Sequence, residues 1–178
     1  WICNLKMNGE LKHASFSSDC KYLFSSGTDG EIYQWDIGQR KCVSRFFDEG
    51  CIKSSSLAVT GSGNNIMVAA GSNTGVVNLY DSNTFMNNST PKPKKTIMNL
   101  TTSITTLEFS HDSQILTLAS KEKRDSLKML HVPSGKIFQN WPTQQTPLGY
   151  VNCVDFSSNN DWFTIGNDKG KALLYRLH

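Results

Sequence analysis

The sequence predicts an all-β fold built from repeated four-stranded sheets, and three observations lead to this prediction. A pattern of four short strands separated by turns recurs after about 45 residues, so that Trp35 and Tyr80 hold equivalent positions. The apolar run at residues 115–119 does not show the strict alternation of a half-exposed strand, as expected for a strand covered on both faces by neighbouring sheets. Glycines such as Gly30 and Gly75 stand where the chain must reverse. These features are typical of a β-propeller, and we expect about four blades of one.

The first full blade is expected at residues 11–48, and residues 1–8 are expected to be the outer strand of a preceding blade. The strands of the first blade are predicted at residues 14–17, 22–27, 31–36 and 42–46. The second blade is expected at residues 52–101, with strands at residues 57–60, 66–71, 76–81 and 96–100. A polar insertion with two prolines, at residues 83–95, separates its last two strands, and such loops carry specificity in a propeller.

The third blade is expected at residues 103–142, with strands at residues 106–110, 115–120, 127–131 and 136–141. The fourth is expected at residues 150–178, with strands at residues 153–157, 162–166 and 171–176 and no fourth strand. Propellers have roughly 4 to 8 blades, and ring closure removes their exposed sheet edges. Four blades could close alone, but we expect them to be part of a seven-bladed ring, in a chain that is a fragment because it begins with Trp1.

The composition predicts a globular protein and argues against several other classes. Apolar residues make up 38% of the chain, and none of its apolar runs approaches the length of a membrane span. The formal charge of +3, from 18 basic and 15 acidic side chains, is too weak to imply nucleic-acid binding by itself. The five cysteines are widely spaced and form no Cys-x-x-Cys pair, which favours a reducing compartment such as the cytosol or nucleus.

No motif in the sequence predicts catalysis or a bound cofactor. Residues 166–172 resemble a phosphate-binding loop, but only three residues separate the glycines and no Ser or Thr follows Lys171, so a strand turn is expected. The four histidines lack the spacing of a zinc site, and the Asp48-Glu49 pair is expected to be solvated or to form a local cap. We therefore expect no catalytic, cofactor-binding or metal-binding residues, no contact with a membrane and no small-molecule substrate.

Two basic clusters on neighbouring blades are the candidate binding residues. Their members are Lys92, Lys94 and Lys95 in the second blade and Lys121, Lys123, Arg124 and Lys128 in the third. They could contact RNA phosphates or a partner protein, although solvated loops would show the same pattern. Aromatic residues do not interleave with them in the sequence, so any RNA contact is expected to involve the backbone and to be sensitive to salt.

Some of these residues resemble a known family. Gly27-x-Asp29-Gly30 followed by Trp35-Asp36 resembles the signature of WD-repeat proteins. The other copies match it more loosely, and the family's Gly-His ahead of the first strand is absent, so that its His-Ser-Asp-Trp hydrogen-bond network is incomplete. Within WD-repeat proteins, the chain looks most similar to the U3 small nucleolar RNA-associated protein 18 family. The segments that carry this resemblance are residues 30–36, 40–42, 47–50, 97–100 and 170–178.

The resemblance implies a non-catalytic scaffold subunit of the small-subunit processome in the nucleolus. Such a subunit would act in U3-dependent processing of pre-ribosomal RNA and in small ribosomal subunit assembly. Its partners would be other WD-repeat proteins of the processome, together with U3 small nucleolar RNA and pre-ribosomal RNA. The alternative is a WD-repeat receptor that reads a peptide across the central channel, as ubiquitin-ligase adaptors and histone readers do. A ring of arginine and aromatic side chains at one mouth of the channel would favour that alternative.

Overall fold

The computed structural model describes residues 2–86, 88–143 and 146–177, and these residues form four antiparallel sheets, one for each repeat. The first sheet contains β1 (Leu11–Phe16), β2 (Tyr22–Gly27), β3 (Glu31–Asp36) and β4 (Lys41–Phe47). The second contains β5 (Ser54–Thr60), β6 (Met67–Ser72), β7 (Val77–Asp81) and β8 (Lys95–Ile97). The third contains β9 (Thr106–Phe109), β10 (Ile115–Ala119), β11 (Leu127–His131) and β12 (Lys136–Ile137). The fourth contains β13 (Val151–Phe156), β14 (Trp162–Asn167) and β15 (Ala172–Arg176), and the predicted all-β fold is confirmed.

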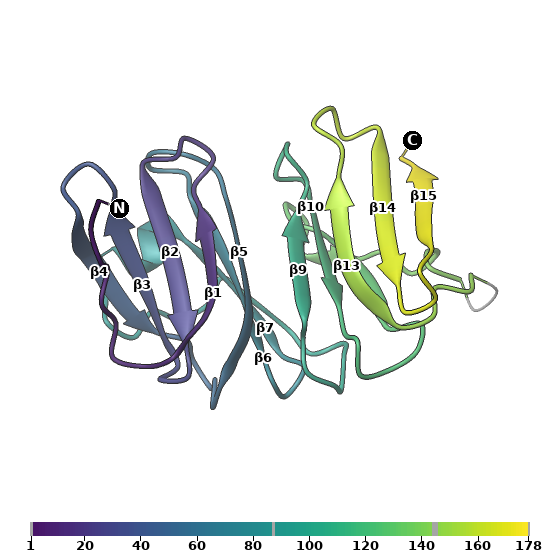
Figure 1. Cartoon of the computed structure of the whole chain (residues 1–178), viewed down its shortest axis with the longest axis horizontal. Coiled ribbons are helices and arrows are strands. Elements are labelled where there is room, and N and C mark those ends of the chain that lie inside the picture. Colours follow the sequence, from purple (N-terminus) through teal and green to yellow (C-terminus); the bar gives the residue numbers. More distant parts are fainter. Residues whose placement is uncertain (1, 87, 144–145, 178) are drawn as a thin grey trace.

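The four sheets lie as consecutive blades along an arc (Figure 1). In each sheet the strands are hydrogen-bonded in chain order. The first strands, β1, β5, β9 and β13, are the inner strands, and each contacts the inner strand of the next sheet. The sheet of β1–β4 and the sheet of β13–β15 therefore lie at the two ends of the arc, at the left and right of Figure 1.

This antiparallel order gives the arc two faces with different loops. The loop after each inner strand lies at the upper face in Figure 1, which we call the hairpin face. The turns between second and third strands lie at the opposite face, together with the segments that connect one blade to the next, and we call it the connector face. Neighbouring loops of the hairpin face are hydrogen-bonded across blades: the Ser18 amide donates to the Gly61 carbonyl at 3.0 Å, and the His111 amide donates to Asn160 Oδ1 at 2.9 Å.

The cores lie between neighbouring sheets. Phe24, Phe46 and Tyr80 are buried between the first and second sheets, and they pack with Phe85 from the polar insertion. Phe85 is the last residue of α1 (Ser82–Phe85), and its ring stacks on Phe46 with the centroids 5.1 Å apart. Burying such a side chain contributes about 2–3 kcal/mol. The insertion is therefore anchored to the first blade by an aromatic residue within an otherwise polar sequence.

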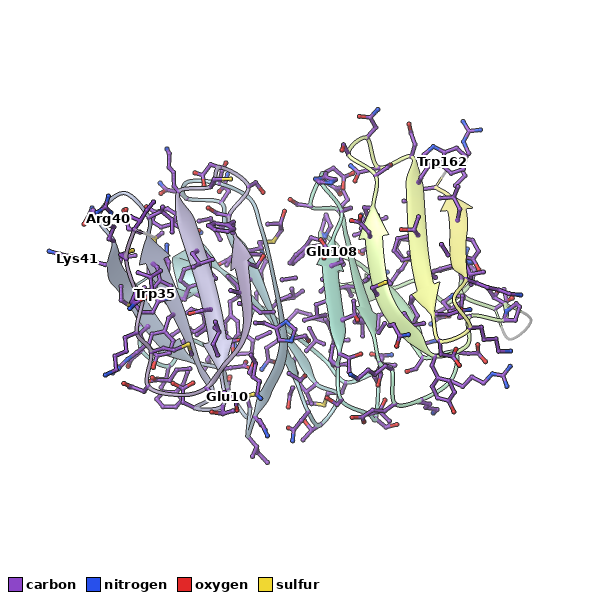
Figure 2. All side chains as sticks on the ribbon, in the orientation of Figure 1. Glu10, Trp35, Arg40, Lys41, Glu108 and Trp162 are labelled. Carbon is purple, nitrogen blue, oxygen red and sulfur yellow. The ribbon has the colours of Figure 1, made fainter. Side chains whose placement is uncertain are left out.

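The sheets at the two ends of the arc expose apolar side chains. On the first sheet, Phe16 is 55% exposed and Phe47 is 49% exposed. On the last sheet, Leu174 is 59% exposed and Trp162, which lies at its upper end in Figure 2, is 42% exposed. At the positions equivalent to Phe16 and Leu174, the two inner sheets bury Phe109 and Leu79, which are 6% and 5% exposed, because each inner sheet has a neighbour on both sides.

Some strand bounds differ from those expected. The outer strands β8 and β12 end at Ile97 and Ile137, well before the expected ends at residues 100 and 141. After β8 ends, the chain continues as the connector to the third blade. This connector buries the side chain of Leu100 between the second and third sheets. Residues 2–10 form no strand, although the Asn8 amide donates to Tyr33 Oη at 3.4 Å. An outer strand of a preceding blade at residues 1–8 stays a prediction, and Trp1 lies outside the described residues.

Candidate interaction surfaces

The WD-like residues of the first blade form a hydrogen-bond network within one sheet. Trp35 Nε1 donates to Ser25 Oγ at 2.8 Å, and the indole stacks on Tyr33 with the centroids 5.7 Å apart. The Tyr33 hydroxyl donates to Asp29 Oδ2 at 2.8 Å or to Glu31 Oε2 at 2.6 Å. Tyr33 thus supplies the partner for Asp29 in a blade that lacks the family's histidine. Burial and these two carboxylates raise the pKa of Tyr33 well above its usual value.

Asp48 joins the first blade to the second. Its Oδ1 accepts hydrogen bonds from Asn78 Nδ2 at 2.8 Å and from Tyr80 Oη at 2.7 Å, and both donors lie on β7. The side chain is buried, with the residue only 5% exposed, so the expectation of a solvated residue in the Asp48-Glu49 pair is wrong for Asp48. Burial raises the pKa of this carboxyl, and the hydrogen bonds from Asn78 and Tyr80 oppose that rise. Asp48 is therefore a structural joint between blades.

The two predicted basic clusters lie on different parts of the molecule. Lys94 and Lys95 lie where the long loop after β7 enters β8, on the outer side of the second sheet. Lys121, Lys123 and Arg124 occupy the turn between β10 and β11, which belongs to the connector face. The loop after β7 approaches the hairpin face, because β7 is antiparallel to β6. The turn with Lys121 and the loop with Lys94 therefore lie at opposite faces of the arc and do not form one continuous surface.

The remaining two candidates differ from their neighbours in the sequence. Lys92 is exposed within the long loop, next to the buried Pro91. Lys128 lies within β11, opposite Leu118 of β10, and is only partly exposed. Lys128 is therefore part of a strand and does not extend the exposed turn at Lys121.

The connector face brings a second basic turn next to the first. The turn at residues 121–125 and the turn at residues 168–171 are both hydrogen-bonded to the connector at Gly149 and Tyr150. The Gly149 amide donates to Asp125 Oδ1 at 2.8 Å, and the Tyr150 amide donates to Asp168 Oδ1 at 3.1 Å. We call these two turns and their connector the turn cluster. Its exposed cations are Lys121, Lys123, Arg124, Lys169 and Lys171.

Sequence reasoning missed three residues of the turn cluster. Lys169 and Lys171 were considered only as part of a failed phosphate loop, although they occupy the same turn of the fourth repeat that Lys121–Arg124 occupy in the third. Tyr150 is 42% exposed and its backbone amide bonds the turn at residues 168–171, so the connector brings an exposed aromatic residue to a cluster in which none interleaves with the cations in sequence. Comparing equivalent turns of successive repeats would have found the lysines. The position of Tyr150 could not be predicted in this way, because Tyr150 lies in the connector between blades and not in a repeated turn.

A groove follows the outer seam between the second and third sheets, and we call it the seam groove. It joins a hollow of about 450 Å³ to a second hollow of about 460 Å³, and both are lined by Lys95 and Gly135. Lys94 lines the first hollow and Lys136 lines the second. Lys136 is the third lysine that lines the groove, and it is contributed by the third sheet and was not predicted from the sequence.

A smaller hollow of about 270 Å³ lies among the inner strands β1, β5 and β9. Its polar lining includes His13, Ser56 and Glu108, and Figure 2 shows Glu108 on β9. Burial lowers the pKa of His13, while burial and then the charge of Asp155 raise the pKa of Glu108. In the described part of the chain, the residues that line this hollow include no arginine, tyrosine, phenylalanine or tryptophan. The lining of this hollow therefore consists of small, aliphatic and hydroxyl-bearing residues together with His13 and Glu108.

The described residues contain neither a metal-binding cluster nor a helix that could span a membrane. Among residues 2–86, 88–143 and 146–177, no group of three or more His, Cys, Asp or Glu side chains is placed to hold a metal ion. None of the helical segments in those ranges has the length and apolar character needed to cross a membrane.

Comparison with known families and proteins identifies the class of this chain. The family model "WD domain, G-beta repeat" matches residues 3–36 and 141–175. The first match includes β1 to β3 and the second includes β13 and β14 with most of β15. Together with the arc of antiparallel sheets, these two matches show a partial β-propeller that contains WD repeats.

The resemblance within WD-repeat proteins is also confirmed. The chain is 42% identical over 178 residues to the human U3 small nucleolar RNA-associated protein 18 homolog, an alignment that covers 99% of this chain and 32% of the human protein. It is 42% identical to the Arabidopsis thaliana homolog, covering 99% of this chain and 32% of that protein. It is 37% identical to U3 small nucleolar RNA-associated protein 18 of Saccharomyces cerevisiae, covering 88% of this chain and 29% of that protein. The chain spans about a third of the length of the curated relatives it matches.

Proposed function

We propose that this chain is the propeller part of a non-catalytic scaffold subunit of the nucleolar small-subunit processome. Such a subunit acts in U3-dependent processing of pre-ribosomal RNA and in assembly of the small ribosomal subunit. The observation that carries the proposal is the 42% identity over 99% of the chain to a human protein described as U3 small nucleolar RNA-associated. Further blades that cover the exposed apolar faces of the first and last sheets would complete a ring, for which we propose seven blades.

The architecture supports an assembly role. Inter-sheet cores and the cross-blade hydrogen bonds of the hairpin face hold the four blades as one rigid body. A rigid body with two loop faces and an outer rim offers several separate binding surfaces, and binding residues are concentrated on loops that a rigid scaffold positions. We propose that the partners are other WD-repeat proteins of the processome, together with U3 RNA and pre-ribosomal RNA.

Affinity purification tests this proposal. The intact protein, tagged and expressed in its own cells, is recovered from nuclear extract in moderate salt, and the RNAs and proteins that accompany it are identified. We expect U3 small nucleolar RNA and other nucleolar WD-repeat proteins. Recovery of cullin-type ligase subunits or histones without U3 RNA would overturn the processome function and favour a receptor. A fluorescent fusion should lie in the nucleolus.

We further propose that the turn cluster makes the RNA contact. Five exposed cations on two adjacent turns can neutralise several phosphates, and the exposed ring of Tyr150 between them can stack on an unpaired base. Three acidic residues in the same turns, Glu122, Asp125 and Asp168, limit the net charge, and Asp125 and Asp168 are used by the connector amides. Binding of moderate affinity to single-stranded RNA follows from this combination.

Two triple variants of equal charge loss test which cluster binds RNA. One changes Lys121, Lys123 and Arg124 to glutamine, and the other makes the same change at the loop lysines 92, 94 and 95. We expect the first variant to weaken binding of single-stranded RNA and to make the slope of log affinity against log salt shallower by about 2, because each contact to a single strand contributes about 0.7. We expect the second to retain most of the binding. The opposite ranking, with both variants folded, would assign RNA binding to the loop lysines.

The receptor alternative has less support from the channel. Peptide reading by arginine and aromatic side chains at a channel mouth would need those residue types there, and the hollow among the inner strands is lined instead by residues such as His13, Ser56 and Glu108. The same purification distinguishes the two functions by the partners that it recovers.

A further inference from the structure

The seam groove has an apolar floor that its neighbours leave partly uncovered. Met67 and Val132 line the first hollow and Ile137 lines the second. All three pack against the buried core between the second and third sheets and remain only partly buried. The outer strands that border this seam, β8 and β12, have only three and two residues, so they do not extend far enough to cover it. The groove therefore exposes the outer edge of a hydrophobic core.

Cations stand along this floor with few anionic partners. The side chain of Lys95 passes over Gly135, since a Cβ added to that glycine would lie 3.5 Å from Lys95 Cδ and Cε. Lys95 and Lys136 make no ion pair with the residues that the structure describes, whereas Lys94 Nζ lies 3.4 Å from Asp81 Oδ2. Three lysines against one aspartate leave the groove with a net positive charge. A ligand that fits must bring carboxylates or phosphates.

The apolar floor of the groove favours a peptide with carboxylates over RNA with phosphates as the ligand. RNA phosphates would neutralise the lysines, but binding to unpaired bases gains its energy from exposed aromatic rings. Tyr80 is the single aromatic residue among those that line the two hollows in the described chain, and it is only 1% exposed. An aliphatic side chain would instead remove the exposed surfaces of Met67, Val132 and Ile137 from water, at about 25 cal/mol for each Å² buried.

We propose that the seam groove binds an acidic peptide segment of a partner protein, with an aliphatic side chain on the apolar floor and carboxylates beside Lys95 and Lys136. The lysines would select for acidic sequences and speed association, while the aliphatic contact would supply much of the affinity. This site lies on the outer seam and is separate from the turn cluster on the connector face. Peptide binding by the seam groove can therefore be tested independently of RNA binding by the turn cluster.

Peptide display tests the proposal on the full natural protein. A random peptide library is selected on the immobilised protein, and enriched peptides are measured by fluorescence anisotropy against the protein and two variants. The test variant is Lys95→Glu with Lys136→Glu, and the control with the same charge change is Lys121→Glu with Lys123→Glu in the turn cluster. Circular dichroism and thermal unfolding show that each variant is folded.

The expected result is a consensus with at least two acidic residues and one aliphatic residue. The test variant should weaken binding of such a peptide at least tenfold, the control variant by less than twofold, and alanine in place of the aliphatic residue should also weaken it. Failure to enrich any peptide, a consensus without acidic residues, or an equal loss in both variants would overturn the proposal. So would a loss of binding to a 20-nucleotide poly(U) RNA in the test variant alone, because the groove would then be an RNA site.

Discussion

Replacing Asp48 with alanine should destabilise the propeller by removing the joint between its first two blades. Asp48 Oδ1 accepts hydrogen bonds from Asn78 Nδ2 and Tyr80 Oη, at 2.8 and 2.7 Å. Asn78 is 3% exposed and Tyr80 is 1% exposed, so water cannot readily replace the carboxylate. A buried donor left without a partner costs about 1–3 kcal/mol. Asn78 Nδ2 keeps its second hydrogen bond, to the Glu49 carbonyl at 2.9 Å, whereas the Tyr80 hydroxyl loses its acceptor. We therefore expect Asp48→Ala to lower the free energy of unfolding by about 1–3 kcal/mol.

Asparagine at the same position is the matched control. The side-chain oxygen of Asp48→Asn can accept the same two hydrogen bonds, so this variant should lose less than about 1 kcal/mol. It also isolates the effect of charge. Burial raises the pKa of Asp48, so the folded protein binds this proton more tightly than the unfolded chain does. The stability that protonation adds is fully present below the unfolded pKa of about 3.9 and is lost as the pH rises through the folded value.

Urea unfolding followed by tryptophan fluorescence provides the assay, since Trp35 on β3 of the first sheet is 6% exposed and unfolding transfers its indole to water. It is run at pH 7 and at several lower values for the natural protein and both variants. The alanine variant should unfold at clearly lower urea at pH 7, and the asparagine variant should lack the Asp48 part of the pH dependence. A loss below about 0.5 kcal/mol for alanine, or equal losses for alanine and asparagine, would refute the account of Asp48 as a joint.

Three further changes test other parts of the fold. Gly75→Ala should cost about 2 kcal/mol or more, because Gly75 has φ +88° and the added Cβ would lie 2.8 Å from the Leu100 carbonyl carbon; thermal unfolding would measure the loss. Trp35→Phe should cost about 1–2 kcal/mol through loss of the bond to Ser25, and combining it with Ser25→Ala should cost less than the sum of the two single changes in urea unfolding. Glu108→Gln should stabilise the protein at pH 7, because burial raises the pKa of Glu108 and its ionised form is disfavoured. That difference should vanish below about pH 4, and a difference unchanged with pH would contradict it.

Local chemistry made most of the fold predictable from the sequence. In the first repeat, the Ser17 hydroxyl accepts from the Tyr22 amide at 3.0 Å, and in the third the Ser110 hydroxyl accepts from the Ile115 amide at 2.9 Å. The same hairpin is thus specified by a residue a few positions away. Strands and turns are determined by hydrogen bonds between residues close in sequence and by the pattern of apolar residues. Because the same pattern recurs in each repeat, it can be recognised in the sequence. The all-β architecture could be predicted for this reason.

The candidate surfaces were less predictable because they depend on contacts between distant residues. Asp48 meets Asn78 and Tyr80, about 30 residues further along the chain. The sequence around it reads as an exposed acidic turn, because nothing local shows that β7 will bury it. Lys136 likewise joins Lys94 and Lys95 only because the second and third sheets pack side by side.

The three seams of the arc differ in a way that explains where the groove lies. Between the first and second sheets, Phe85 fills the outer gap and stacks on Phe46. Between the third and fourth, Trp141 packs edge-to-face against Tyr175 with the centroids 5.1 Å apart, and the remaining hollow is about 240 Å³. Between the second and third, no aromatic side chain of the described residues fills the equivalent space, and lysines border it instead. Aromatic side chains that fill a seam contribute to the stability of the fold and leave little room for a ligand. The seam between the second and third sheets is open and lined by lysines, so it is the one available to a partner.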